Sequence, residues 1–290
     1  MSLLADPPPS PSLFPYYPDL RDRVALITGV GQVGIPDSDT WGNGAATARI
    51  LAHSGAKVFG CDLNLQAAEY TARRLRDDNP DSIVHTTTCD VTRADDVERM
   101  VQECMSRHGR IDILVNNVGM TAPGDPGNMS EEVWDQQIQL NLKSVFLVSR
   151  CVLPIMEKQG RGTIVNNTSL TAIRYIGKPQ IGYASAKAAV VQYTKATGCM
   201  YAKRGVRVNA VIPGLMYTPL VENLGASESA VDKEVFRKIT QHNVPMGKMG
   251  TGHDVGMAVA FLCSDAARYI TATTLVVDGG LAESTGTGGI

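Results

Sequence analysis

The chain has 290 residues, and its 27 Lys and Arg residues nearly balance its 29 Asp and Glu residues. The resulting net charge of -2 argues against a nucleic-acid-binding protein with a strongly basic surface. A hydrophobic content of 43% is sufficient to bury the core of one large α/β domain or of two small ones.

The N-terminal segment is rich in proline, since six of the 15 prolines lie within residues 1–18. Proline fixes φ and has no backbone N–H, so we expect residues 1–22 to form an arm and not a regular helix or central strand. No signal-peptide core precedes the prolines. The longest stretch without a charge, residues 208–221, has 14 residues, whereas a membrane span needs roughly 20. We therefore expect no membrane span, no export and a cytoplasmic location.

The six cysteines are scattered along the chain, and none belongs to a C-x-x-C pair or lies beside a histidine at metal-ligand spacing. The five histidines include no H-E-x-x-H motif. This pattern predicts free thiols in a reducing compartment and no metal site.

Strand-like apolar runs alternate with helical segments from residue 23 onward. The predicted strands are residues 24–28, 57–61, 83–87, 111–116, 163–168, 206–211 and 273–277. The predicted helices are residues 44–53, 65–76, 93–108, 130–157, 182–203 and 253–262. Parallel strands need crossovers of a dozen or more residues, which these helices provide. The pattern predicts a single α/β domain, residues 23–280, with a doubly wound, Rossmann-like parallel sheet of about seven strands, helices on both faces, and a C-terminal tail, residues 281–290.

The first predicted strand is followed by a literal G-x-G-x-x-G sequence, residues 29–34. This fingerprint is meaningful only where its last glycine opens a helix, and Gly34 is followed by turn-forming residues. A second cluster, Gly42-Asn43-Gly44, leads directly into a predicted helix whose N-terminus can hold an anion. We therefore assign the pyrophosphate of a dinucleotide to Gly29 together with Gly42, Asn43 and Gly44. The alternative is that these glycines serve only a tight strand-to-helix turn.

Asp62 ends the second predicted strand, 18 residues after Gly44. A carboxylate at this position can accept both ribose hydroxyls of an adenosine, and it repels a 2'-phosphate. Residues 30–48 contain no Lys or Arg that could pair with such a phosphate. Asp62, with the adjacent Leu63, therefore favours NAD over NADP, although an aspartate at a strand end can also serve only as a turn residue.

A Tyr183-x-x-x-Lys187 motif lies in the predicted helix that follows the fifth strand. Further motifs accompany it in chain order: Asn116-Asn117-Val118-Gly119, Asn141, Ser169, Pro213-Gly214, Thr218 and Val277-Asp278-Gly279-Gly280. With this set the sequence resembles the single-domain branch of the short-chain dehydrogenase/reductase family over roughly residues 23–280. The resemblance implies a nicotinamide-dependent oxidoreductase whose catalytic residues are Asn141, Ser169, Tyr183 and Lys187.

The chemistry of this set explains the residue types. Tyr183 and Lys187 lie four positions apart, hence on one face of a helix. A tyrosine with a pKa of about 10 needs roughly 4 kcal/mol of phenolate stabilisation to titrate near pH 7. Lys187 and the charge of an oxidised nicotinamide can supply it, so Tyr183 acts as general acid or base. By the resemblance Ser169 holds the substrate oxygen and Asn141 anchors a water in a proton relay. The alternatives are a cap for Ser169 and backbone bonding for Asn141.

The resemblance also implies the rest of the cofactor site. Asp90 and Val91 flank the adenine, Asn116 and Gly119 line the groove, and Thr218 binds the nicotinamide carboxamide. The same cofactor-binding set includes Asn117, Pro213, Gly214, Tyr183 and Lys187.

The chain departs from the family pattern in its glycine-rich loop, where twelve residues, 30–41, stand in place of the usual three. Two doublings of loop length cost only about 1.2 kcal/mol, so the fold tolerates the nine extra residues. Because the insertion lies beside the predicted pyrophosphate site, we expect it to cover the cofactor or to contact a neighbouring subunit.

The sequence therefore predicts an NAD-dependent oxidoreductase that interconverts a secondary alcohol and a ketone. One alternative is an NADPH-dependent ketone or acyl-thioester reductase, which Asp62 disfavours. Another is a non-catalytic dinucleotide-binding protein, which the complete catalytic set disfavours. We expect a small-molecule substrate in a partly apolar pocket under a lid, residues 215–244, with residues 120–124 and 174–175 as further walls. We also expect a homo-oligomer, a tetramer by resemblance to the family.

Overall fold

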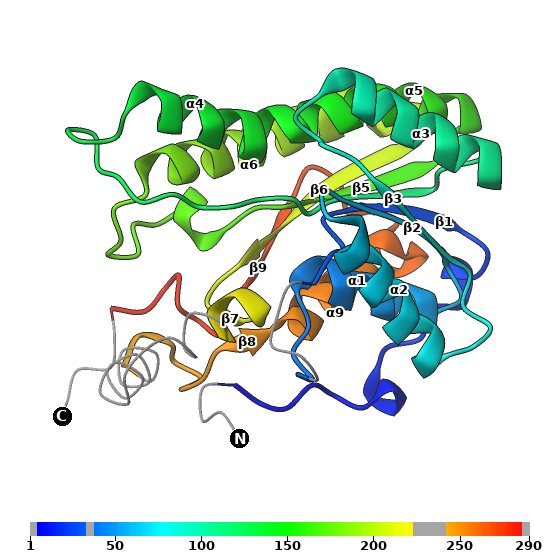
Figure 1. Cartoon of the computed structure of the whole chain (residues 1–290), viewed down its shortest axis with the longest axis horizontal. Coiled ribbons are helices and arrows are strands. Elements are labelled where there is room, and N and C mark those ends of the chain that lie inside the picture. The colour runs from blue at the N-terminus through cyan, green and yellow to red at the C-terminus, as the bar shows by residue number, and fades with distance from the viewer. Residues whose placement is uncertain (1–4, 33–37, 223–241, 286–290) are drawn as a thin grey trace.

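The computed structural model describes residues 5–32, 38–222 and 242–285. A parallel sheet of seven strands in the order β3-β2-β1-β4-β5-β6-β9 forms its centre (Figure 1). The strands are β1 (Val24–Thr28), β2 (Lys57–Asp62), β3 (Val84–Thr88), β4 (Ile113–Asn116), β5 (Gly162–Asn167), β6 (Val206–Pro213) and β9 (Thr274–Val277). The predicted doubly wound parallel sheet is confirmed.

Helices cover both faces of the sheet (Figure 1). One face carries α1 (Asn43–His53), α2 (Leu65–Asp78) and α9 (Gly252–Cys263). The other carries α3 (Ala94–His108), α5 (Ser144–Gln159) and α6 (Ile181–Tyr201). All five residues of β1 are buried, as expected for a central strand covered on both sides. The strand order reverses between β1 and β4, so the carboxyl ends of these strands border the crevice where ligands of such sheets bind.

Residues 5–22 pack onto the sheet domain without forming an α-helix. They contain two short 3-10 helices, Pro11–Leu13 and Pro18–Leu20. Leu20 is fully buried, and the ring of Phe14 stacks on His253 of α9 with 5.6 Å between centroids. The arm thus contributes apolar side chains to the core beneath α1 and α9.

The long helix predicted at residues 130–157 is interrupted in the structure. It consists of α4 (Glu131–Ile138), a π-helical segment, η3 (Gln139–Lys143), and α5. Short π segments inside α-helices often mark functional sites. Here the segment contains Asn141, so the interruption coincides with a predicted catalytic residue.

The helical stretch Glu131–Gln159 is long enough to cross a membrane and contains an 18-residue window with a mean hydropathy of 1.3. Packing explains part of this apolar character, because α5 packs against α3 and β5. Only 44% of its most apolar window is buried, and Phe146 is among the residues left exposed. The apolar character of this stretch therefore exceeds what its own sheet covers.

A small parallel sheet that the sequence did not predict lies at the two ends of the segment predicted to be the lid. It pairs β7 (Met216–Tyr217) with β8 (Gly250–Thr251). The two strands bracket most of the predicted lid, of which residues 223–241 lie outside the described part of the chain.

The six cysteines are free thiols, and four of them are buried. Within the residues that the structure describes, no three His, Cys, Asp or Glu side chains gather as metal ligands.

Candidate active site

Three of the predicted catalytic side chains converge near the carboxyl end of β5. Ser169 follows this strand, and Tyr183 and Lys187 lie in the first two turns of α6. The Ser169 hydroxyl hydrogen-bonds the Tyr183 phenol, and Lys187 Nζ lies 5.7 Å from the centre of the Tyr183 ring. A hydroxyl, a phenol and an amine therefore share one site, as acid–base chemistry on a carbonyl or alcohol requires.

Lys187 is buried at 2% exposure, and its Nζ donates to the carbonyl oxygen of Asn167 at 2.9 Å. Burial lowers the pKa of Lys187 to about 8 because the ammonium loses hydration. Near neutral pH the side chain therefore remains mainly charged but is poised to give up its proton.

Tyr183 experiences opposing influences on its pKa. Burial raises the pKa above the ordinary value of 10, and the hydrogen bond from Ser169 lowers it by a smaller amount. The phenol therefore stays protonated in this state of the protein. Deprotonation near neutral pH needs additional positive charge next to the phenolate.

Asn141 fixes the backbone that follows β4. Its Nδ2 donates to the carbonyl oxygen of Met120 at 3.0 Å, and its Oδ1 accepts from the Met120 N–H at 3.1 Å. The side chain thus makes the backbone bonds that the sequence left open as an alternative. A Cβ added to Gly119 would lie 2.8 Å from Lys187 Nζ and 3.0 Å from Asn141 Oδ1, so only glycine fits between them.

The floor of the crevice is a chain of hydrogen bonds that links three strand ends. Asn117 Nδ2 donates to the carbonyl oxygen of Gly29 at 2.8 Å, and its Oδ1 accepts from Asn167 Nδ2 at 2.8 Å. The hydroxyl oxygen of Thr28 accepts from the Asn117 N–H at 3.1 Å. Asn167 also supplies the carbonyl that holds Lys187, so the cofactor side and the catalytic side of the crevice share one network.

Asn116 differs from its predicted position in the groove. Its side chain is buried, and Nδ2 donates to Asn166 Oδ1 at 2.8 Å and to Ser149 Oγ at 3.3 Å. We therefore expect the side chain of Asn116 to join sheet and helix layers and only its backbone to border a cofactor. The sequence motif could not show which of Asn116 and Asn117 has its side chain in the crevice, because both residues are asparagine.

The start of α1 has the features of an anion site. Gly42 is the N-cap, no side chain caps the first amides, and the first turn contains no acidic residue. A Cβ at Gly42 would meet nothing within 4 Å, whereas one at Gly44 would overlap the carbonyl oxygen of Gly29. Asn43 Oδ1 is buried without a hydrogen-bond partner, which a polar ligand would satisfy. Open space before an uncapped helix N-terminus fits the pyrophosphate of a dinucleotide.

Asp62 lies at the end of β2 with its carboxylate oriented by two backbone amides. Oδ2 accepts from the Gly31 N–H at 2.8 Å, and Oδ1 accepts from the Asn64 N–H at 3.0 Å. The adjacent Leu63 is 73% exposed, so it offers no competing charge and leaves room beside the carboxylate. Each carboxylate oxygen has a further lone pair for a ribose hydroxyl.

The predicted adenine-side residues lie after β3. Val91 is buried, while Asp90 Oδ1 accepts from both the N–H and the hydroxyl of Thr92, at 2.9 and 2.6 Å. The carboxylate of Asp90 therefore closes its own turn, which presents the turn backbone and Val91 at this edge of the crevice.

The predicted nicotinamide-side residues follow β6. The Gly214 N–H donates to the Val277 carbonyl oxygen at 2.9 Å, and a Cβ at Gly214 would lie 2.6 Å from that of Asp278. This close approach explains why Pro213-Gly214 and the Val277–Gly280 motif occur together. A helical turn begins at Thr218, and the Thr218 carbonyl oxygen accepts from the Glu222 N–H at 2.9 Å.

The described part of the inserted loop contacts α2 and the segment after β6. The indole of Trp41 is buried, with the guanidinium groups of Arg74 and Arg49 lying 3.8 and 4.5 Å from its ring. At the other end of residues 38–41, the Ser38 hydroxyl donates to the Glu222 carboxylate at 2.7 Å. The insertion therefore reaches the segment that was predicted to form the lid, in the same chain.

A hydrogen bond joins Thr121, in the predicted pocket wall at residues 120–124, to Gln180, which the sequence did not predict as a site residue. The Thr121 hydroxyl donates to Gln180 Oε1 at 2.8 Å. The two segments are also joined through Gly124, whose N–H donates to the Pro179 carbonyl oxygen at 2.9 Å and whose own carbonyl accepts from the Ile181 N–H at 3.1 Å. The only sequence signal was the position of Gln180, three residues before Tyr183.

Arg174 was expected in the pocket wall, but its guanidinium is engaged elsewhere. It donates to the carbonyl oxygens of Leu281 and Ala282, both at 2.6 Å. The loop after Ser169 is thereby tied to the segment that follows β9. The partners of Arg174 are backbone carbonyls, which no pattern of residue types reveals.

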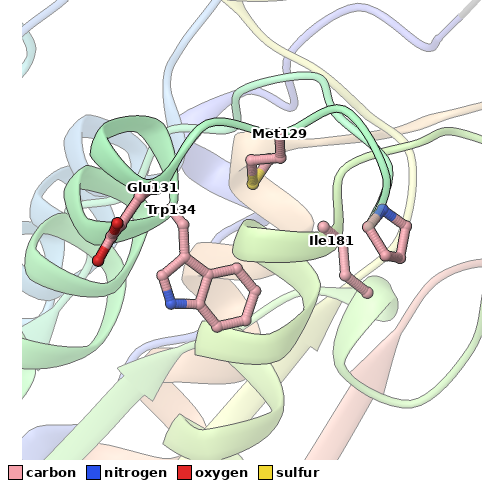
Figure 2. A pocket seen from close by; sticks show the side chains of 5 residues that line it. Met129, Glu131, Trp134 and Ile181 are labelled. Carbon is pink, nitrogen blue, oxygen red and sulfur yellow. The ribbon is translucent and has the colours of Figure 1, made fainter.

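A pocket of about 420 Å³ lies beside the N-terminus of α6 (Figure 2). Its lining is mostly apolar and comprises Pro126, Met129, Glu131, Trp134 and Ile181. None of the four predicted catalytic residues lines it, so this pocket adjoins the candidate active site without containing its chemistry.

Residues 39–282 match the family model described as Enoyl-(Acyl carrier protein) reductase. The levodione reductase of Leifsonia aquatica is 38% identical over 263 residues, which cover 89% of this chain and 94% of that protein. The 3-oxoacyl-[acyl-carrier-protein] reductase of Thermotoga maritima is 35% identical, with 90% of this chain and 98% of that protein covered. A crystal structure of a short-chain dehydrogenase/reductase from Burkholderia xenovorans superposes with a TM-score of 0.86 at 42% identity, covering 92% of this chain and 98% of that chain.

Proposed function

This chain belongs to the short-chain dehydrogenase/reductase family and is an oxidoreductase of that type, and we propose that it transfers a hydride between NAD(H) and a secondary alcohol or ketone. The observation that carries the proposal is the convergence of Ser169, Tyr183 and Lys187 in a fold whose helix α1 begins without a side-chain cap. Similarity to a levodione reductase supports a carbonyl substrate.

The choice of NAD rests on Asp62. Its carboxylate is already oriented by two amides and is followed by an uncharged, exposed Leu63. A 2'-phosphate would bring about two negative charges to this carboxylate. The alternative is an NADPH-dependent ketone or acyl-thioester reductase, which similarity to a 3-oxoacyl-[acyl-carrier-protein] reductase supports.

The residues of the chain divide the work between holding the cofactor and moving a proton. The amides at the start of α1 bind the pyrophosphate, and Asp62 binds the adenosine ribose. A bound nicotinamide supplies the hydride acceptor or donor. Val91 and the Asp90 turn border the adenine, and Gly119, Pro213, Gly214 and Thr218 border the nicotinamide half.

Proton transfer is the task of the catalytic side chains. Ser169 holds the substrate oxygen against Tyr183 by a hydrogen bond. In alcohol oxidation the Tyr183 phenolate takes the hydroxyl proton, and in ketone reduction the phenol returns it. The Lys187 ammonium stabilises the phenolate, and Asn141 holds a water that reconnects Lys187 to solvent.

The same proposal extends to the assembly and its surroundings. Exposed apolar side chains lie on the long helices, with Phe146 of α5 at 46% and Met200 of α6 at 60% exposure. We place the contact surface of a homotetramer on these helices. We assign the catalytic domain to residues 23–280 and the substrate lid to residues 215–244, and we place the protein in the cytoplasm.

A substrate panel with both cofactors tests the proposal. Cyclic and aliphatic ketones are offered with NADH or NADPH, and secondary alcohols with NAD or NADP, while absorbance at the reduced-nicotinamide band is followed. We expect turnover with NAD(H) that is lost in Ser169→Ala. Turnover only with NADP(H) favours the alternative, and dinucleotide binding without turnover on any alcohol or ketone favours a non-catalytic binding protein.

A further inference from the structure

Of the two residues after Val30, Gly31 donates to the Asp62 carboxylate, as described for the site, and Gln32 has no role in the site so far. Gly31 and Gln32 belong to the literal G-x-G-x-x-G sequence that the sequence analysis set aside, because its last glycine does not open a helix. In the structure each of them contacts a different part of the cofactor crevice.

Gly31 contacts Asp62. Its N–H donates to Asp62 Oδ2 at 2.8 Å. A Cβ at this position would lie 2.6 Å from the carboxyl carbon of Asp62 and 3.0 Å from the Cβ of Ala67 on α2. The backbone can therefore approach the carboxylate this closely only because residue 31 is glycine.

Gln32 contacts the start of α1. It is 7% exposed, and its Oε1 accepts from the Gly42 N–H at 3.0 Å. This bond joins positions ten residues apart and so closes the base of the inserted loop. The Thr71 hydroxyl, which donates to the Val30 carbonyl oxygen at 2.7 Å, holds the same base against α2.

We propose that Gly31 and Gln32 are positioning residues for the two halves of the cofactor. The Gly31 amide orients the Asp62 carboxylate for the adenosine ribose, and the Gln32 carboxamide holds Gly42 so that the start of α1 faces the pyrophosphate. The inference rests on the proposed function and deepens it. It also explains how twelve residues can separate Gly29 from Gly42 while the crevice keeps its shape, because Gln32 restores a short connection.

The two residues have separable effects on cofactor binding. Asp62 meets only the part of the cofactor in which NAD and NADP differ, whereas the pyrophosphate is common to both. A disruptive substitution at Gly31 therefore changes the preference between the cofactors. A disruptive substitution at Gln32 weakens the binding of both cofactors equally and leaves the preference unchanged.

Binding of NADH and NADPH to the full chain, followed by nicotinamide fluorescence, tests the Gly31 part. Gly31→Ala is expected to weaken NADH by about 10-fold or more and NADPH much less. In an Asp62→Ala background the same change is expected to leave the ratio unaltered, because the interaction partner is gone. Gly127→Ala is the matched control, since its Cβ would meet only the side chain of Asp125 in an exposed turn.

Gln32→Met tests the other part, since it keeps an unbranched side chain of similar length and removes the acceptor. We expect NADH and NADPH to weaken by the same factor, about 3- to 10-fold. Gln102→Met, on the exposed surface of α3, serves as the control. If Gly31→Ala does not fold, as judged by thermal melting, the Gln32 comparison still decides whether the loop base positions the cofactor.

Several outcomes overturn the inference. An equal effect of Gly31→Ala on both cofactors, or an undiminished effect in the Asp62→Ala background, contradicts the role of Gly31. Unchanged binding in Gln32→Met contradicts the role of Gln32. If Asp62→Ala itself leaves the preference unchanged, the NAD assignment of the proposed function is wrong. If Asp62→Ala changes the preference and Gly31→Ala does not, only the present inference is wrong.

Discussion

The two sides of the crevice are built in different ways. On the side predicted to be catalytic, the groups that meet are side chains: Lys187 is buried, and the partly exposed Tyr183 lies against Ser169. On the cofactor side, the contacts are mainly backbone amides, at Gly31, at Gly42 and at the open start of α1. Substitutions on the first side should change chemistry, and substitutions on the second should change binding.

The largest expected effect that NADH and NADPH share comes from Gly44→Ala. The added Cβ overlaps the carbonyl oxygen of Gly29 and crowds Asn117 Nδ2, so the start of α1 must shift. We expect NADH and NADPH to weaken alike by about 100-fold in a fluorescence titration. Gly34→Ala, in the literal fingerprint but outside the described residues, is expected to change affinity little, and the reverse order would contradict the assignment of the pyrophosphate.

Asp62→Ala comes next and should separate the two cofactors. Loss of charge-assisted bonds to the ribose and of repulsion toward a 2'-phosphate corresponds to about 2 to 4 kcal/mol, or roughly 30- to 1,000-fold in preference. We expect the variant to bind NAD more weakly and to have a smaller difference in affinity between NAD and NADP. Adding Leu63→Arg should reduce this difference further. Equal use of NAD and NADP by the unmodified protein would remove the basis of this prediction.

On the catalytic side, Lys187 links pH to both rate and stability. Oxidation requires the Tyr183 phenolate, so the rate of oxidation should rise with pH, and Lys187→Met should move that rise to higher pH.

The pKa of Lys187, which burial lowers to about 8, also affects folding stability. Between pH 8 and 10.5 the unfolded chain binds a proton at Lys187 that the native chain lacks, so stability rises with pH there.

The size of this folding effect is bounded by the pKa difference, at about 3 kcal/mol over the full interval. It is measured as the difference in urea-unfolding free energy between the unmodified protein and Lys187→Met from pH 7.5 to 9.5. We expect the difference to change in favour of the unmodified protein as pH rises. A difference independent of pH would mean that the ammonium is not desolvated.

The smallest expected effect concerns the bond between the insertion and the segment after β6. Ser38→Ala removes the hydrogen bond to Glu222 without touching the crevice floor. We expect NADH affinity to fall by about 2- to 5-fold, in keeping with one partly exposed bond to a charged group. Ser12→Ala, in the exposed arm, is the control, and an equal effect of both would assign the change to general stability.

The sequence predicted the side-chain half of this comparison better than the backbone half. Strand and helix alternation identified all seven strands of the large sheet, because the central strands contain apolar runs and the edge strands β3 and β9 follow at the same spacing. The motif around Tyr183 identified residues that the structure brings together, since i and i+4 positions share a helix face. The π segment at Asn141 was not predicted, because a single helical periodicity runs through it.

The contacts of Gly31, Gln32 and Arg174 were missed for another reason. Each involves a backbone amide or carbonyl group of a residue distant in sequence, and such partners leave no mark on residue type. Of the literal glycine fingerprint, only the first glycine, Gly29, is part of the predicted pyrophosphate site, because Gly34 opens no helix. The second glycine of the fingerprint nevertheless contacts the residue that the cofactor prediction depends on.

The central claim is that Tyr183 moves the proton while the cofactor side only binds, and Tyr183→Phe tests it most directly. The ring remains and the transferable proton is lost, so we expect turnover with NAD(H) to fall by about 1,000-fold while the dissociation constant of NADH, measured by fluorescence on the same sample, changes less than about 3-fold. Turnover near that of the unmodified protein, or a loss of turnover matched by an equal loss of NADH binding, would contradict the account.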